Sequence, residues 1–108
     1  MKRGDLVQVA LPGAFGKPRP ALIVQSDLFA AHPSVTICLL TSHPQPTPLF
    51  RHTIEPNPEN GLTTVSQIQV DKLMTLPRAK LGQVIGRLTK QQMQEVTQLL
   101  ALWVGIAG

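Results

Sequence analysis

An arginine held between two prolines is the residue of this chain best placed to do chemistry. Arg19 stands between Pro18 and Pro20, and an apolar run at residues 21–24 follows directly. Proline fixes its own φ and keeps the residue before it extended, so the guanidinium is expected at the mouth of a buried strand. A guanidinium is a rigid fork that suits phosphate. The plain alternative is an exposed arginine at a strand edge, and this stretch alone favours that alternative.

Two further polar residues are expected at strand ends. Thr41 closes the apolar run of residues 35–40, and Asp71 closes the alternating run of residues 63–70. Short polar groups at strand ends beside loops can form a shallow cleft. With Arg19, these side-chain types suit cleavage of a phosphodiester by its own 2′-hydroxyl, which needs a base, a donor to the developing charge and a proton for the leaving oxygen. Each residue also has an ordinary alternative: an edge cation, a strand threonine and a turn aspartate.

Other kinds of chemical site find less support. The three histidines and the single cysteine show none of the paired spacings of a zinc site, and scattered surface histidines explain them better. The sequence holds no glycine-rich phosphate loop and no nucleophile elbow. We therefore expect neither a metal nor a cofactor.

The composition is that of a globular protein with a basic balance. A chain of 108 residues, 43% hydrophobic and 15% charged, is expected to form one domain over residues 1–108. The net charge of +4 weakly favours an anionic partner such as nucleic acid. A single cysteine, no apolar run of membrane-spanning length and no secretory signal pattern together predict a cytoplasmic protein that does not bind a membrane.

The elements that must position Arg19, Thr41 and Asp71 are mostly short strands. Alternating or fully apolar runs predict strands at residues 5–11, 19–25, 35–40, 49–55, 63–70, 73–76 and 84–88. The strand at 19–25 is apolar on both faces and should be central, whereas the strand at 49–55 should lie at an edge. One helical turn is expected within residues 26–33, capped by Ser26 or Asp27.

A C-terminal helix is the clearest element in the sequence. Thr89 is a natural N-cap, Gln92 completes a capping box, and Gly105 supplies the stop. One face of the helix is apolar. That face carries Met93, Val96, Leu99, Leu100 and Trp103. The pattern predicts a mainly β fold with a C-terminal α-helix, either a small curled barrel or a compact sheet closed by the helix.

Taken in chain order, several segments resemble the MazF/PemK family of toxin–antitoxin ribonucleases. The matches are residues 2–7 to "KRGDIV", residues 19–27 to "RPALVVQSD", residues 39–42 to "PITS", residues 61–76 to "GL…S…(D/E)QIRT(I/L)" and residues 86–89 to "IGxLS". Each match alone is weak. Their shared order over nearly the whole chain is fairly specific.

The resemblance implies a small SH3-like barrel of the PemK/CcdB type that forms a homodimer. It implies metal-independent, sequence-selective cleavage of single-stranded RNA to 2′,3′-cyclic phosphate and 5′-OH ends. It also implies inhibition by a cognate antitoxin protein whose tail covers the active groove. By position, Arg19 matches the family's catalytic arginine and Thr41 its catalytic threonine or serine. Asp71 falls on an acidic position that some members use as a base, and Ser42 is a candidate phosphate contact.

The chain departs from the family pattern in ways that bear on RNA binding. Its first loop is short, Met74 stands where many members have arginine, and Lys72 replaces the usual glutamine. Lys72 and Lys17 are candidate RNA-binding cations. Phe15 in the short loop either stacks on an unpaired base or folds back over the barrel end, with neither favoured.

Two other functions remain open from the sequence. A gyrase poison of the CcdB type ends in a Trp-Gly-Ile tail, which residues 103–106 resemble imperfectly because Val104 intervenes. Trp103 also lies on the apolar helix face, which favours a core or dimer role. The other alternative is an SH3-like interaction domain without catalysis. Leu102 projects toward the polar side of the helix, either against a partner chain or as a single exposed leucine.

Overall fold

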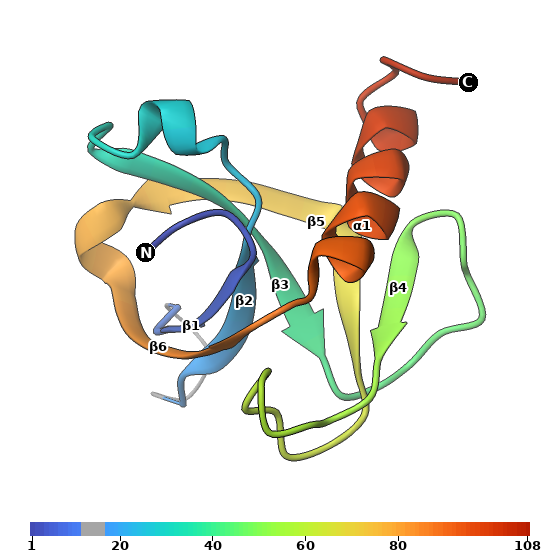
Figure 1. The fold of residues 1–108 in the computed structure, drawn as a ribbon, viewed down its shortest axis with the longest axis horizontal. Coiled ribbons are helices and arrows are strands. Elements are labelled where there is room, and N and C mark those ends of the chain that lie inside the picture. The colour runs from blue at the N-terminus through green and yellow to red at the C-terminus, as the bar shows by residue number, and fades with distance from the viewer. Residues whose placement is uncertain (12–16) are drawn as a thin grey trace.

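One curved antiparallel sheet and a C-terminal helix make up the fold (Figure 1). The computed structural model describes residues 1–11 and 17–108. Within these residues the strands are β1 (Asp5–Val9), β2 (Arg19–Ile23), β3 (Ser34–Thr41), β4 (Arg51–Ile54), β5 (Ser66–Pro77) and β6 (Leu81–Arg87). The helix is α1 (Lys90–Trp103), and two 3₁₀ turns are η1 (Asp27–Phe29) and η2 (Arg78–Lys80).

The strand order is β4-β5-β3-β2-β1-β6, which makes β2 central and places β4 at an edge, as predicted. The edge strand β6 curls back toward the segment after β4, where the N–H of Arg87 donates to the carbonyl of Glu59 at 2.9 Å. The sheet is thus barrel-like. The predicted fold class, mainly β with a C-terminal helix, is confirmed.

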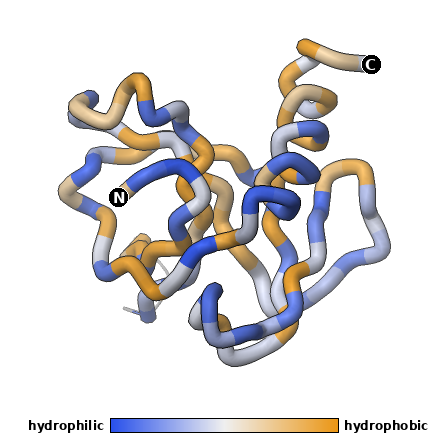
Figure 2. Tube along the Cα trace, viewed as in Figure 1, coloured by the Kyte–Doolittle hydropathy of each residue, from blue (hydrophilic) through white to orange (hydrophobic). Residues whose placement is uncertain are grey.

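The two faces of the sheet bury separate apolar clusters because successive strand residues point to opposite sides. One cluster packs under α1, and its most buried members are Leu6, Leu22, Cys38, Ile68, Val70 and Val96. The other fills the opposite face with Val7, Val9, Ala21, Val35 and Ile37. Figure 2 shows the hydrophobic residues gathered along the central strands and hydrophilic ones at the start of α1.

Helix α1 begins and ends as its sequence predicts. The Thr89 hydroxyl accepts from the Gln92 N–H at 3.1 Å, and the Gln92 side chain accepts from the Thr89 N–H at 2.9 Å, which completes the capping box. The helix ends before Gly105, whose φ of +82° suits glycine. Ser26 likewise caps η1, where its hydroxyl accepts from the Leu28 N–H at 3.2 Å.

The apolar face of α1 is buried only over its first turns. Met93 and Val96 are buried, whereas Trp103 is 49% exposed and Leu102 42% exposed. Trp103 packs against Phe50, which precedes β4, with the ring centroids 6.1 Å apart. The predicted face is therefore confirmed for Met93 and Val96 and, partly buried, for Leu99 and Leu100, and Trp103 lies at the margin of the core.

The prediction of two strands around residue 71 is wrong. β5 runs unbroken from Ser66 to Pro77, so Asp71 lies in mid-strand rather than at a strand end. The pairing of β3 with β5 shifts between Cys38–Leu73 and Leu40–Ile68, so residues 69–72 of β5, Asp71 among them, bulge opposite Leu39. The acidic residue is tolerated there because Arg51 on the neighbouring β4 pairs with it. β6 also begins earlier than predicted, at Leu81.

Candidate active site

A groove of about 330 Å³ lies where β2 begins and β3 ends. Its size is at the lower end of the range for small-ligand sites. β2 contributes Arg19, β3 ends in Thr41, and Ser42 and His43 follow β3. Gln8 of β1, Ile85 of β6 and the segment of residues 61–64 complete much of the lining. Ser42 therefore lies beside the two residues expected to do chemistry.

Sheet register brings Arg19 and Thr41 together. Ala21 of β2 pairs with Leu39 of β3, and continuing this antiparallel register by two residues places Arg19 opposite Thr41. Arg19 is exposed, and within the described part of the chain it makes no ion pair. Its guanidinium is thus available to an anion.

The end of β3 orients the Thr41 hydroxyl. The backbone N–H of His43 donates to Thr41 Oγ1 at 3.2 Å. A hydroxyl that accepts one hydrogen bond keeps its own proton for donation. Thr41 can therefore donate to a negatively charged oxygen in the groove.

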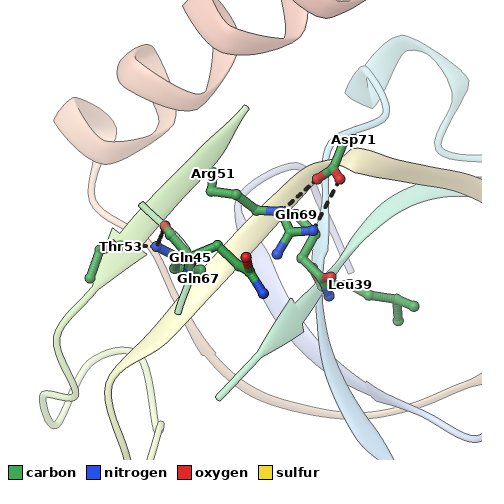
Figure 3. A network of polar contacts seen from close by, with 7 residues as sticks. All are labelled: Leu39, Gln45, Arg51, Thr53, Gln67, Gln69 and Asp71. Carbon is green, nitrogen blue, oxygen red and sulfur yellow. Dashed lines mark hydrogen bonds and ion pairs between the residues drawn. The ribbon is translucent and has the colours of Figure 1, made fainter. Parts of the chain in front are cut away.

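The loop that carries Ser42 and His43 is anchored on β5. The amide group of Gln67 accepts from the Gln45 N–H at 2.8 Å and donates to the Gln45 carbonyl at 2.9 Å. Gln67 also donates to Thr53 of β4 at 3.2 Å (Figure 3). Gln67 is 5% exposed, so these bonds are shielded from water and hold the loop against the sheet.

The opposite wall of the groove depends on a buried asparagine. Asn60 is 1% exposed, its Oδ1 accepts from the Leu62 N–H at 3.0 Å, and its Nδ2 donates to the Glu55 carbonyl at 2.9 Å. The next residue, Gly61, has φ of +68°, and a Cβ there would lie 2.1 Å from the Ile85 carbonyl oxygen. The turn after β4 is therefore fixed against β6, and so is the wall that it leads into.

Gln8 is a groove residue that sequence reasoning missed. It pairs with Pro20 and shares a strand face with Leu6, which is fully buried. Its side-chain oxygen is buried with no hydrogen-bond partner among the described residues. The alternation of Val7, Val9 and Leu11 puts Gln8 on the opposite face, and Leu6 two residues before it was the one sign that this face is buried.

Asp71 stands apart from the described groove lining. Its carboxylate accepts from Arg51 Nε at 2.7 Å and from the second guanidinium nitrogen at 3.0 Å (Figure 3). The side chains of Arg51 and Asp71 are only 11% and 17% exposed. The hydrogen bonds from Arg51 hold the pKa of Asp71 below its usual value, against the opposing effect of burial. The structure therefore pairs Asp71 with Arg51 on the neighbouring strand and outside the described lining of this groove, and its part in the reaction stays a prediction.

The other residues predicted to bind RNA do not line the groove with Arg19 and Thr41 in the described part of the chain. Lys17 is exposed just before Arg19, and Lys72 is exposed on β5, and neither is one of the described residues that line the groove. Phe15 lies outside the residues that the structure describes. Met74, at the position of the family's arginine, packs partly buried against the second apolar cluster.

Cys38 is not placed as a nucleophile. It is fully buried, and burial, with the nearby Asp71 charge, raises the pKa of its thiol to about 12. The thiolate is therefore not accessible near neutral pH. In residues 1–11 and 17–108, no three or more His, Cys, Asp or Glu side chains gather as a set that could ligate a metal ion. Over the same residues, no helix is long and apolar enough to cross a bilayer.

Solved structures share the fold. The chain superposes on an endoribonuclease in complex with its cognate antitoxin from a mycobacterial species with a TM-score of 0.81 and 24% identity, over 100% of this chain and 98% of that one. It also superposes on the Mycobacterium tuberculosis toxin MazF-mt6 with a TM-score of 0.81 and 22% identity, over 96% of this chain and 99% of the other. At 22–24% sequence identity, these two superpositions establish a shared fold and nothing further.

Sequence comparison shows the family. The chain is 45% identical over 109 aligned positions to a probable endoribonuclease MazF from Mycolicibacterium smegmatis (strain ATCC 700084 / mc(2)155), over 100% of both chains. The family model described as "PemK-like, MazF-like toxin of type II toxin-antitoxin system" matches residues 2–104. With its curved sheet, its C-terminal helix and this match over nearly its full length, the chain belongs to the PemK-like, MazF-like family of type II toxins.

Proposed function

We propose that this chain is an endoribonuclease that cleaves single-stranded RNA without a metal, leaving 2′,3′-cyclic phosphate and 5′-OH ends. The observation that carries the proposal is that Arg19 and Thr41 line one groove. The chemistry needs stabilisation of the charge that develops on the non-bridging phosphate oxygens. A guanidinium and a hydroxyl with a free proton are both suited to that task.

The roles of the two residues differ. The Arg19 guanidinium pairs with the scissile phosphate in the ground state and more strongly as charge develops. The Thr41 hydroxyl donates to a phosphate oxygen, and Ser42 beside it offers a second contact. Loss of one such donor typically lowers kcat by about 10²–10³-fold.

The test is incubation of the purified protein with a long single-stranded RNA in EDTA, with the fragment ends mapped. We expect discrete cuts with cyclic phosphate ends, and no cuts with Arg19→Ala at an unchanged thermal midpoint. Lys80→Ala is the matched control, since it removes an exposed cation on η2 outside the described groove lining. Intact RNA with the wild-type protein, or equal cleavage by Arg19→Ala, would contradict the proposal.

We also propose that a cognate antitoxin covers the groove. The fold relative with a TM-score of 0.81 is a complex of an endoribonuclease with its antitoxin. The groove contains Arg19, and residues 42–46 beside it are exposed. An acidic antitoxin tail could pair its charge with Arg19 and pack on those exposed residues. Hydrogen exchange should show protection of residues 40–48 in the complex.

A homodimer is the assembly that we propose. The C-terminal end of α1 and the residues after it expose a run of apolar side chains, among them Leu102 at 42% and Ile106 at 83%. Such a cluster favours a protein contact. Sedimentation equilibrium should give twice the mass of the chain, and Leu102→Glu should shift it toward the monomer.

The family match favours the ribonuclease over the gyrase-poison alternative. Trp103, the residue on which that alternative rests, belongs to α1 and packs against Phe50.

A further inference from the structure

We propose that His43 is the general base that removes the proton of the attacking 2′-hydroxyl. The inference deepens the proposed function and rests on it. It names a residue that the family resemblance does not assign, and it gives the reaction the proton acceptor that Arg19 and Thr41 do not supply.

The composition of the groove carries the proposal. Among the described lining residues only Arg19 and His43 have side chains that titrate, and no carboxylate is among them. Residues 12–16, which the structure does not describe, read Pro-Gly-Ala-Phe-Gly and contain no titratable side chain. Asp71, the acidic residue suggested by the resemblance, is paired with Arg51 and is not one of the described lining residues. A guanidinium stays protonated, which leaves the imidazole as the acceptor.

Imidazole is also the side chain best matched to this role at neutral pH, since a general base works best when its pKa lies near the operating pH. Among the described groove residues, the one other charged side chain is that of Arg19 of β2, and exposed Lys17 precedes Arg19 in the chain. Neither cation can accept a proton, so neither competes with His43 for the role of base.

Backbone anchoring on both sides places His43. Its own N–H donates to Thr41 Oγ1 at 3.2 Å, and two residues later Gln45 is held by the buried Gln67. The histidine therefore sits on a segment that is fixed at both ends, beside the residue that contacts the phosphate. Because His43 is exposed, it can exchange its proton with water after each turnover.

The proton balance of the step closes. Neutral His43 accepts the 2′-hydroxyl proton while the 2′ oxygen forms a bond to phosphorus and the bond from phosphorus to the 5′ oxygen breaks. The leaving 5′ oxygen takes a proton from water. The imidazolium then returns its proton to the hydroxide that remains, so the enzyme is unchanged and the RNA has only rearranged into two fragments.

The first experiment compares wild type and His43→Gln on the same RNA from about pH 5 to 9, with kcat and KM measured separately. We expect kcat at neutral pH to fall by at least about 100-fold with KM changed less than about threefold, and the fall in wild-type rate at acid pH to disappear. His32→Gln is the matched control, because His32 is exposed near η1 and is not one of the described groove residues. Unchanged kcat and an unchanged pH profile in His43→Gln would overturn the inference while wild-type cleavage still supports the proposed function.

A second experiment separates a base from an acid. An RNA with sulfur in place of the bridging 5′ oxygen has a leaving group that needs no proton, so it would rescue a variant that lacks the acid. We expect no rescue of His43→Gln by this substrate and partial rescue of His43→Ala by added imidazole. Rescue by the sulfur substrate would assign His43 as the acid and overturn the proposal.

Discussion

At the scale of single residues, the buried side-chain oxygen of Gln8 lowers the stability of the free protein, and a hydrogen bond from a bound substrate could offset that loss. A buried acceptor without a partner destabilises a protein by about 1–3 kcal/mol. Among the described residues none bonds to Gln8 Oε1, and the residue lines the groove. We expect Gln8→Leu to raise the free energy of unfolding by about 1 kcal/mol and KM for RNA by about three- to tenfold, the worth of one hydrogen bond. Urea denaturation and steady-state cleavage measure the two effects.

The control for this prediction is Gln83→Leu, which makes the same change at an exposed position on β6. It should alter neither quantity by much. Lower stability and an unchanged KM in Gln8→Leu would mean that the amide is satisfied by a bound water and has no part in RNA binding.

The Arg51–Asp71 pair makes a prediction about pH. Its hydrogen bonds hold the pKa of Asp71 below its usual value, so the carboxylate stabilises the fold above the unfolded-state pKa of about 3.9, and this contribution is lost as the pH falls through the lowered folded-state pKa. We expect Asp71→Asn to cost about 2 kcal/mol near pH 7, with the difference from wild type shrinking below about pH 4. Denaturant unfolding at a series of pH values measures it.

The same variant tests the role that the family resemblance gives Asp71. Because the carboxylate is bound by Arg51 outside the described groove lining, cleavage per folded molecule should stay within about threefold of wild type. Lys72→Ala, an exposed change one residue on, is the stability control and should cost less than about 0.5 kcal/mol. If Asp71→Asn lost most of its cleavage activity while its free energy of unfolding matched that of wild type, Asp71 would have a direct part in the reaction.

Residue types and local context predicted part of this site. Arg19 and Thr41 could be placed at strand ends from the apolar runs beside them. The antiparallel register of β2 and β3 then brings these two strand ends to the same side of the sheet. Asp71 could not, because its partner Arg51 lies on another strand and no local pattern joins them. His43 looked like a scattered surface histidine because its place in the groove depends on the fold.

At the scale of elements, the turn after β4 determines one wall of the groove. Asn60 supplies the bonds to the Leu62 N–H and the Glu55 carbonyl, and replacing it leaves those buried backbone groups unpaired. We expect Asn60→Ala to cost about 2–4 kcal/mol, the sum of two or three lost buried bonds, and to lower the thermal midpoint by roughly 10 °C or more. Differential scanning calorimetry measures the change.

Glu59→Ala is the matched control, because the neighbouring side chain is exposed and only its backbone carbonyl contacts Arg87. If Asn60→Ala melted like wild type, the wall would owe its position to Gly61 and β6 instead.

Elements were predicted well wherever local signals mark both ends. The capping box and the glycine stop gave α1 its bounds, and Ser26 marked η1. β5 was divided in error because Asp71 and Lys72 look like a turn in the sequence. In the fold, residues 69–72 bulge from the pairing with β3, and the bonds from Arg51 of β4 hold Asp71 within a continuous strand.

At the scale of the whole molecule, the fold determines which positive charges are paired with carboxylates and which are left exposed. Asp5 and Asp71 neutralise Arg87 and Arg51, whereas the described residues give Arg19 no such partner. The net charge of +4 therefore does not act as one uniform patch. Among the described residues it leaves the cation of Arg19 in the groove, and a second cluster of charged residues at the start of α1 consists of Arg3, Asp27, Arg87 and Lys90.

Salt dependence distinguishes binding at the groove from attraction by the whole surface. Binding of an RNA blocked by 2′-O-methyl groups should weaken with salt by a log–log slope of about −0.7 for each phosphate neutralised. If Arg19 and Lys17 each hold one phosphate, affinity should fall about sevenfold between 50 and 200 mM salt, and Lys17→Ala should make the slope shallower by about 0.7. Lys90→Ala should leave the slope unchanged, because its cluster lies apart from the described groove lining. Fluorescence anisotropy titrations measure both slopes, and an equal change in the two variants would mean that the RNA path extends from the groove to the start of α1.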